Sequence, residues 1–423
     1  MTNSSGAPTR PLDRRLGLRD GVALGLAAMI GAGLFSAFAP AAASAGRWLV
    51  LSVVIAALVA AANASSMARL AARYPDSGGA YVYGRERLGL PWGHLAGWAF
   101  VVGKVASCAA MAMTLAVHVW PNFAKPIAVL AVLAVLALNL QGVHRSARVA
   151  LGIVALVVTL VVTFGAVMLI APPVTVDTPP PAVPGSGTPA GVLQGAGFLF
   201  FAFAGYARVA TLGEEITDPR RTIPRAIGIA LLVVLALYVL VAVALTSSLG
   251  AGWLAAREAP LAEAAEISAW PWLGPALRVA AILAAGGALL ALVLGASRTL
   301  MAMARDRHLP PVLATVDGPH RTPRRAEAVI AGLVIVLIVL VDLRGAIAFS
   351  SFLVLTYYAI ANASAWTLEG RAATKVVPSL GLLACVGIAF LLPWQAVVAG
   401  VVVLGLGAFI GWARHTTREH PDA

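Results

Sequence analysis

Charged residues are scarce in this chain. Only 11% of its 423 residues are Asp, Glu, Lys or Arg, whereas 60% are hydrophobic and the mean hydropathy is +0.89. A soluble globular protein of this size carries more charge, so the composition excludes that class. Cysteine is scarcer still: the two residues, Cys108 and Cys385, both fall inside apolar runs, so no disulfide framework is indicated.

Motifs for catalysis and nucleotide binding are also missing. The sequence has no H-E-x-x-H zinc spacing, no G-x-S-x-G nucleophile turn and no paired aspartates within an apolar run, which argues against an intramembrane enzyme. It has no G-x-x-x-x-G-K-(S/T) loop, which argues against an ATP-driven pump. His118 and His144 are isolated and fit structural roles. We therefore expect no catalytic residue, no metal site and no cofactor.

Long apolar runs dominate what is present. A helix needs about 20 mainly apolar residues to cross a bilayer, and the sequence offers twelve such runs. The predicted spans are residues 18–45, 47–70, 92–119, 124–141, 148–171, 193–213, 225–249, 273–300, 326–342, 346–366, 376–393 and 395–413. The expected fold class is all-α, a polytopic membrane protein with 12 transmembrane helices.

The net charge of +12 is concentrated in alternate loops. Arginines precede the first span and recur in every second loop, for example Arg220 and Arg221, while the intervening loops hold few basic residues. This positive-inside pattern predicts cytoplasmic N- and C-termini in the cell (cytoplasmic) membrane and argues against nucleic-acid binding. Ala43-Ser44-Ala45 resembles a signal-peptide cleavage site, but the alternation requires span 1 to remain, so we expect no cleavage.

The domain organisation predicted from these spans is a single transmembrane domain, 18–413, between cytoplasmic tails 1–17 and 414–423. Residues 172–189 are rich in Pro, Gly and Ser, lack Lys and Arg, and are expected to form an external linker. Five spans precede this linker, so the next five enter the membrane in the opposite direction. This predicts a first repeat (18–171), an inverted second repeat (193–366), and two further helices (376–413).

The first span contains a local weakness. Gly31 and Gly33 lie in its middle, one residue apart, and glycine is a poor helix former where lipid offers the backbone no other partner. Span 6 carries Gly205 at the corresponding place of the second repeat, followed by Arg208. Interrupted spans at matching positions are a pointer to a transporter binding site. The alternative is that these glycines only allow close helix packing.

The direction of the chain gives these breaks different chemistry. Beyond the break, span 1 restarts near Ala32 and Gly33 with free backbone N–H groups, which favour a carboxylate. Span 6 ends its outer half between Phe201 and Ala204 with free carbonyls, which suit an ammonium group. An α-amino acid carries both charges on adjacent atoms. The candidate substrate-binding residues are Ile30, Gly31, Ala32, Gly33, Phe201, Ala202, Ala204 and Gly205.

Ionisable side chains inside spans are costly and are functional candidates by default. Lys104 lies in span 3 on a polar stripe that includes Ser107 and ends at His118, and Arg208 lies in span 6. A desolvated lysine can cycle between charged and neutral forms, so Lys104 is a candidate proton carrier. Lys104, Ser107 and Arg208 are the coupling or pathway candidates. The alternative is a buried structural ion pair or a packed small-residue face.

Four ordered motifs resemble the amino acid–polyamine–organocation (APC) superfamily of permeases. Span 1 carries Ile30-Gly31-Ala32-Gly33-Leu34-Phe35, and the next inner loop carries Pro75-Asp76-Ser77-Gly78-Gly79-Ala80-Tyr81. Span 6 is followed by Glu214-Glu215-Ile216-Thr217-Asp218-Pro219, and span 8 by Arg298 and Met303-Ala304-Arg305-Asp306. The resemblance extends over about residues 16 to 412.

This resemblance implies the LeuT-type fold, a 5+5 inverted repeat with broken helices 1 and 6, and amino acid transport by alternating access. It implies that Gly31, Ala32 and Gly33 meet the substrate carboxylate and that carbonyls of Phe201 and Ala204 meet its amino group. Phe201 matches an outer gating position. Glu214 and Glu215 become candidates for the cytoplasmic gate.

The chain also departs from its apparent relatives. Span 5 lacks the lysine that replaces sodium in some proton-coupled members, and span 3 has Gly103 and Lys104 where a cationic member has an acid. We therefore expect a neutral or otherwise non-cationic amino acid, moved by proton coupling or exchange, with no role for sodium. An exchanger or nutrient sensor on the same fold, without net accumulation, is the alternative. The sequence does not specify the oligomeric state.

Overall fold

The computed structural model describes residues 17–74, 78–142, 147–171, 186–206, 216–306, 309–315 and 323–419, and these contain helices but no β-strand. The α-helices are α1 (Leu18–Met29), α2 (Ala32–Ser36), α3 (Phe38–Ala45), α4 (Leu49–Arg73), α5 (Ala80–Leu88), α6 (Leu90–Val119), α7 (Ala124–Leu140), α8 (Ala147–Ile170), α9 (Pro189–Phe203), α11 (Pro219–Ser248), α12 (Gly250–Ala255), α13 (Pro260–Glu266), α14 (Leu273–Arg305), α15 (Arg324–Leu340), α16 (Leu343–Trp366), α17 (Ala373–Leu391) and α18 (Trp394–Glu419). Short 3₁₀ turns, η1 to η4, occupy Gly46–Trp48, Pro121–Phe123, Ala204–Tyr206 and Pro311–Ala314.

Eleven segments of the described chain are long and apolar enough to cross a membrane. Each overlaps one of eleven of the twelve spans predicted from the sequence. The exception is the predicted span 326–342, which corresponds to α15; this helix has 17 residues and falls just short in length. The first segment ends at Ser36 and the second runs from Phe38 to Arg73, so residues 38–45, predicted as part of span 1, fall in the second segment. The chain is therefore an all-helical, polytopic membrane protein.

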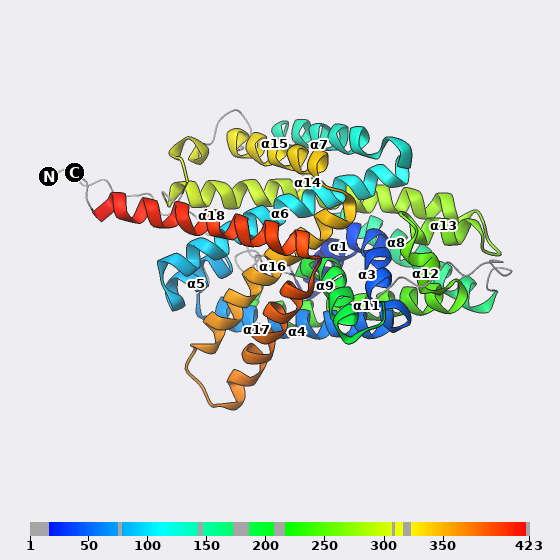
Figure 1. Cartoon of the computed structure of the whole chain (residues 1–423), viewed down its shortest axis with the longest axis horizontal. Helices are drawn as coiled ribbons and strands as arrows, with labels where there is room; N and C mark the ends of the chain where they lie inside the picture. The colour runs from blue at the N-terminus through cyan, green and yellow to red at the C-terminus, as the bar shows by residue number, and fades with distance from the viewer. Residues whose placement is uncertain are drawn as a thin grey trace.

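The long helices α6 and α16 form the centre of the molecule. Of their most apolar stretches, 78% and 89% of residues are buried, against 17% for α18 and 22% for the segment that contains α7. Figure 1 shows α18 lying across α6 and α16, and α7 and α15 side by side beyond α14. The peripheral helices expose apolar side chains such as Leu383 and Val402, as expected for surfaces that face lipid.

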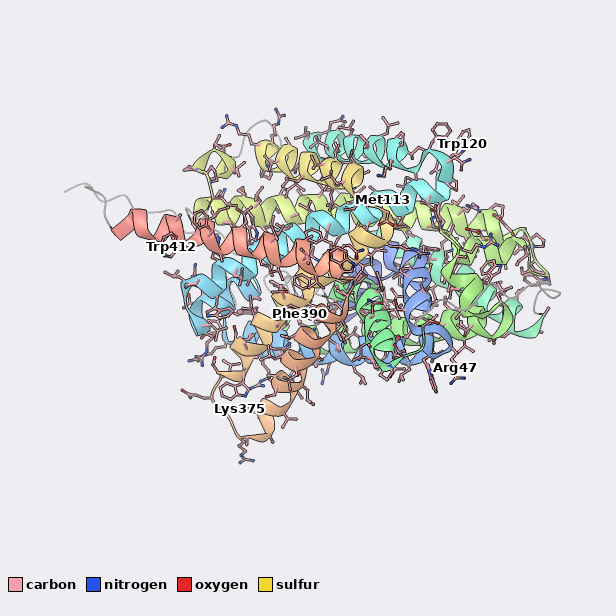
Figure 2. All side chains as sticks on the ribbon, viewed as in Figure 1. Arg47, Met113, Trp120, Lys375, Phe390 and Trp412 are labelled. Carbon is pink, nitrogen blue, oxygen red and sulfur yellow. The ribbon has the colours of Figure 1, made fainter. Side chains whose placement is uncertain are left out.

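Loops that the charge pattern places on opposite sides of the membrane lie at opposite ends of the molecule. Figure 2 shows Arg47 and Trp120 toward one end and Lys375 and Trp412 toward the other, with Met113 between them. Tryptophans are typical of the membrane–water interface. The long axis of Figure 2 therefore runs between the two polar boundaries of the molecule.

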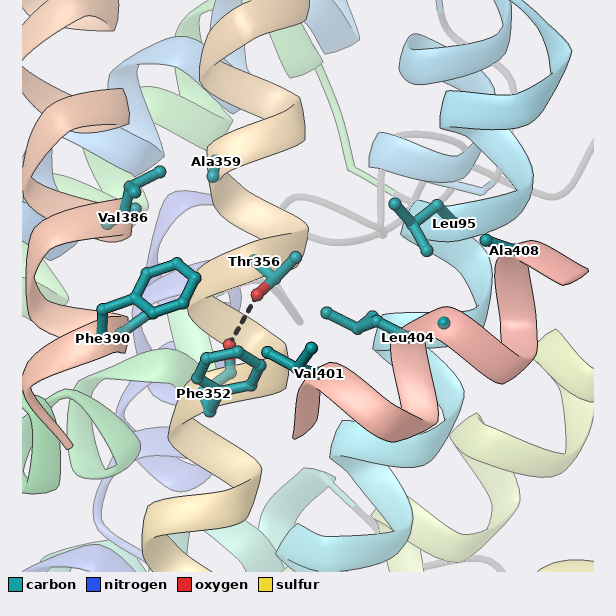
Figure 3. A pocket seen from close by; sticks show the side chains of 12 residues that line it. Leu95, Phe352, Thr356, Ala359, Val386, Phe390, Val401, Leu404 and Ala408 are labelled. Atoms are coloured by element: carbon teal, nitrogen blue, oxygen red, sulfur yellow. Dashed lines mark hydrogen bonds between the residues drawn. The ribbon is translucent and has the colours of Figure 1, made fainter. Parts of the chain in front are cut away.

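An apolar groove opens between α6, α16, α17 and α18, with a volume of about 380 Å³. Figure 3 shows Phe352 and Phe390 on one side and Leu95 and Leu404 on the other. The one labelled hydroxyl, on Thr356, donates to the carbonyl of Phe352 at 2.9 Å. The groove therefore offers hydrocarbon rather than polar groups, and it lies apart from the interrupted helices.

Candidate functional site

The first span is interrupted within the predicted segment. Helix α1 ends at Met29, where the N–H of Ile30 still donates to the carbonyl of Leu26 at 2.7 Å, and α2 begins at Ala32. Gly31 between them has φ −105° and ψ −136°, which is not helical. The N–H groups of the first turn of α2 have no acceptor within their own helix. Ala37 then joins α2 to α3 with helical dihedral angles.

The α-helix of the sixth span ends in the middle of the predicted segment. Helix α9 ends at Phe203 and is followed by the 3₁₀ turn Ala204–Tyr206. Residues 207–215 lie outside the described residues, and so do three predicted candidates: Arg208, Glu214 and Glu215. The described part of this span therefore contains the end of α9, at the position that the sequence predicts.

The two interruptions touch each other. A Cβ on Gly33 would overlap Cα and Cβ of Ala202 in α9, and a Cβ on Gly205 would overlap the carbonyl of Ala28 in α1. Gly31 faces α14, where its Cβ would lie 3.2 Å from that of Ala288. Close packing and helix interruption, offered as alternatives by the sequence, therefore occur together. The candidate substrate-binding residues converge on one place, which is almost fully buried: Ile30, Ala32, Phe201, Ala202 and Ala204 are each 8% exposed or less.

Tyr238 of α11 bridges both helix ends. Its hydroxyl donates to the carbonyl of Met29 at 2.8 Å and lies 3.4 Å from that of Ala202. The ring is fully buried and packs edge-on against Phe38 and Phe203, with centroids 5.6 and 5.0 Å away. One free carbonyl at the end of α1 is thereby satisfied by a side chain. The sequence analysis missed this residue, although it is the one polar side chain in the middle of a long aliphatic run.

Lys104 is buried in α6 at 8% exposure. Its ammonium lies 5.4 Å from the ring centre of Phe100, and no carboxylate in the described ranges forms an ion pair with it. Ser107, one turn later, shares a hydrogen bond of 2.7 Å with Ser350 of α16 and donates to the carbonyl of Gly103 at 3.0 Å. Ser107 thus joins α6 to α16, whereas the amine of Lys104 has no anionic partner among the described residues.

The outer end of the same polar stripe reaches α2. The imidazole of His118 is 3% exposed and meets the ring of Phe35 edge-on, with centroids 5.7 Å apart. Its Nδ1 lies 2.8 Å from the carbonyl of Thr114, while Nε2 has no partner among the described residues. The stripe predicted for span 3 therefore faces the half-helix that follows the first interruption. No group of three His, Cys, Asp or Glu among the described residues could hold a metal ion.

The family model described as amino acid permease matches residues 20–413. The chain belongs to the amino acid permease family. Membership implies a small-molecule amino acid substrate and a place in a membrane, and it agrees with a transporter rather than an enzyme.

The relatives of this permease are transporters. It is 54% identical over 429 residues to the uncharacterized transporter Rv1999c of Mycobacterium tuberculosis, covering 97% of this chain and 96% of that one. It is 27% identical to the branched-chain amino acid permease BcaP of Bacillus subtilis, covering 95% and 93%. It is 29% identical to the vacuolar cationic amino acid transporter 4 of Arabidopsis thaliana, covering 78% and 59%.

In the permease, two of the sequence motifs meet at the end that bears the basic loops. The hydroxyl of Tyr81 in α5 donates to the Oδ2 of Asp306, after α14, at 2.6 Å. Burial and this hydrogen bond raise the pKa of Tyr81 above its usual value. Arg85 lies 3.8 Å from the same carboxylate oxygen. Gly79, just before α5, has a φ of +58°, a conformation that favours glycine. This turn places the N–H of Ala80 so that it donates to the hydroxyl of Tyr357 in α16 at 2.9 Å.

Proposed function

We propose that the chain is a secondary active permease that moves a neutral, or otherwise non-cationic, amino acid by alternating access. One observation carries the proposal: the ends of two interrupted helices meet in the buried interior and are joined by Tyr238. Irregular backbone at membrane depth is tolerated where it lines a cavity. Backbone N–H groups at one helix end and backbone carbonyls at the other carry opposite partial charges, so together they can bind one small ligand that bears both charges.

Recognition of the substrate follows from those charges. The free N–H groups of Ala32, Gly33 and Leu34 begin a helical run that continues through α3, so they favour the substrate carboxylate. Carbonyls at Phe201 and Ala204 favour the ammonium group, with that of Ala202, 3.4 Å from the hydroxyl of Tyr238, beside them. Tyr238 already occupies the carbonyl of Met29, which leaves recognition of the ammonium to the end of α9. Gly31 and Gly205 let the helices approach closely here, and Ile30 lies beside them at the end of α1.

The proposed substrate class rests on Lys104. A cation in the pathway repels a second cation in a low-dielectric setting more strongly than in water. The relatives divide on this point, since one is named for branched-chain and another for cationic amino acids. The unpaired ammonium beside Phe100 favours the first group, so neutral amino acids with apolar side chains are the proposed substrates.

The proposed architecture has twelve spans, with α15 as the ninth. Its repeats are 18–171 and, inverted, 193–366, followed by 376–413; the tails 1–17 and 414–423 face the cytoplasm of a cell whose cytoplasmic membrane holds the protein. Glu214 and Glu215 are proposed for the cytoplasmic gate and Arg208 for the pathway. Coupling is proposed to use a proton or a second amino acid, with Lys104 and Ser107 on the pathway and no sodium.

The deciding experiment uses the purified permease in two stages. Thermal unfolding is first measured with each neutral, acidic and basic amino acid, because a ligand that binds the folded state alone raises the unfolding temperature. Proteoliposomes then test uptake of the ligands that bind. Accumulation driven by a pH gradient supports proton coupling, and counterflow without accumulation supports exchange. Binding without either would instead support the sensor, and no binding would contradict the proposed site.

A further inference from the structure

Glu327 is a buried carboxyl that the proposed mechanism does not use. It lies in the first turn of α15, its side chain is 0% exposed, and neither of its oxygens has a hydrogen-bond partner in the described part of the chain. A buried carboxylate without a partner costs several kcal/mol, so such a group either acquires a partner or takes up a proton.

Asn139 is a second buried polar side chain without partners. It lies in the last turn of α7 at 1% exposure, and both its Oδ1 and its Nδ2 lack hydrogen bonds to described residues. Leaving a buried amide unsatisfied also costs free energy, about 1 to 3 kcal/mol. Four buried polar atoms, two on each residue, thus lack hydrogen-bond partners among the described residues.

The register of α7 and α15 places these two residues at the same end of the helix pair. The helices lie side by side in Figure 1, and at their far end the ammonium of Lys125 donates to the carbonyl of Val339 at 2.8 Å. From that bond, Asn139 is 14 residues along α7 (139 − 125) and Glu327 is 12 residues along α15 (339 − 327), which is about 21 and 18 Å of helix. The two helices are antiparallel, so both residues lie at the opposite end of the pair.

Each residue also lies at or next to the end of the buried stripe of its helix. On α7 the buried residues are Ala128, Val132, Val135 and Asn139. On α15 they are Ala326, Glu327, Ile330, Ala331, Val334 and Ile338. Both stripes face the inner layer that contains α6 and α14. The carboxyl and the amide therefore enter the same buried region from neighbouring helices.

The chemistry of the two groups is complementary in one protonation state. A protonated carboxyl donates its O–H to Oδ1 and accepts from Nδ2, which satisfies both groups with two hydrogen bonds. An ionised carboxylate can accept from Nδ2 but leaves Oδ1 without a donor. A bound proton is thus the ligand that satisfies all four atoms.

The charged groups nearby allow the proton to leave. Arg298 of α14 is exposed and is the charged side chain that acts electrostatically on Glu327. Arg324 and Arg325 of α15 itself are exposed. Arg305, at the end of α14, is exposed as well. The other charged or titratable groups on the packed helices are engaged or distant: Lys125 of α7 and Arg278 of α14 at the other end, His94 of α6 at the carbonyl of Gly407, Lys104 at Phe100, Cys108 one turn beyond Lys104, and His118 at the carbonyl of Thr114.

We propose that Glu327 and Asn139 form a proton-binding site. The two side chains are not hydrogen-bonded to each other in the conformation described here. The carboxyl of Glu327 holds the proton, and rotation of the two side chains within the buried region pairs it with Asn139. When α15 moves relative to α14, the O–H bond breaks, the proton passes to water at the end that bears Arg298, and the carboxylate pairs with that guanidinium. For the transport cycle, which is the part that rests on the proposed function, pH at this end then sets the rate of the conformational change.

Infrared difference spectroscopy of the purified permease tests the proton itself, without any transport assay. Protein at neutral pH is expected to show the C=O stretch of a protonated carboxylic acid that is lost in Glu327→Gln. Glu263→Gln is the matched control, since Glu263 is paired with Arg257 at 3.3 Å. Asn139→Ala retains the acid but is expected to shift its band to higher frequency. A wild type without the band, a band that survives in Glu327→Gln, or a band unmoved in Asn139→Ala would each overturn the proposal.

A transport arm uses counterflow at equal pH on both sides. The wild-type rate is expected to change about tenfold as pH changes by a unit across the titration of Glu327, and Glu327→Gln is expected to remove that dependence. A pH dependence unchanged in Glu327→Gln would contradict the link to transport. If no amino acid is exchanged at any pH, the proposed function fails, while the infrared result still decides the proton site.

Discussion

The hydroxyl of Tyr238 donates to the carbonyl of Met29 at 2.8 Å, across 209 positions of the sequence. This bond caps the end of α1 and, with the carbonyl of Ala202 3.4 Å away, joins both interrupted helices to α11. Tyr238→Phe keeps the buried ring and removes the hydroxyl. We expect about 1 kcal/mol lower stability and weaker substrate binding, because the free carbonyl of Met29 is left buried.

Thermal unfolding and ligand titration of the same preparation check this expectation. Thr246→Val is a useful control in α11, since within the described ranges its hydroxyl bonds only to carbonyls of its own helix, at Ala242 and Val243. An equal loss of substrate affinity in both variants would show that Tyr238 has no special role at the interruptions.

Gly33 and Gly205 are expected to tolerate no side chain. Gly33→Ala and Gly205→Ala would press a methyl group against the backbone of Ala202 and Ala28, and overpacking of this kind costs about 1 to 3 kcal/mol or more. Gly228→Ala in α11 is the matched control, because nothing lies within 4 Å of its added Cβ. We expect transport to be lost in the first two variants and kept in the third, measured by uptake at equal amounts of folded protein. Normal uptake by Gly205→Ala would contradict the close approach of the helices.

Lys104→Ala is expected to abolish uptake driven by a pH gradient while leaving substrate binding measurable. Removing the cation should also relax selectivity toward basic amino acids, since the repulsion of a second positive charge is lost. Uptake of neutral and basic amino acids in proteoliposomes checks both effects. Full pH-driven uptake by the variant would exclude Lys104 as the proton carrier, and unchanged rejection of basic amino acids would exclude it as the selectivity element.

Tyr81 predicts a dependence of stability on alkaline pH. Burial, followed by the hydrogen bond to Asp306, raises its pKa in the folded protein, so its contribution is present below the unfolded value of about 10 and is lost as pH rises toward the folded value. Tyr81→Phe should therefore lower stability at neutral pH and lose less on alkalinisation than the wild type does. Denaturation curves at neutral and alkaline pH measure the difference, and parallel losses would contradict it.

Much of this arrangement could be predicted because it depends on local sequence. Glycine at positions 31, 33 and 205 weakens a helix whatever surrounds it, and the helices end at Met29 and Phe203, beside those glycines. The basic charge of alternate loops likewise predicts the succession of spans along the chain. Helix α15 departs from the predicted set of twelve because it is only 17 residues long.

The rest depends on contacts that no local pattern contains. Tyr238 and Met29 meet only because α11 packs against α1. Asn139 and Glu327 lie near basic loops, where an acid or amide is ordinarily solvated, and their burial follows from the packing of α7 and α15 on the inner helices. Similarly, the Tyr81–Asp306 bond joins two motifs that the sequence shows only as separate segments.

The most direct test of the central claim is a thermal-shift measurement with matched ligands. A neutral amino acid at about 100 times its dissociation constant should stabilise the purified permease by about 2.7 kcal/mol. Its methyl ester, which lacks the carboxylate for Ala32 and Gly33, and its N-acetyl form, which lacks the ammonium for the end of α9, should give no shift. Equal shifts with all three, or no shift with any amino acid, would contradict a site built on the paired helix ends.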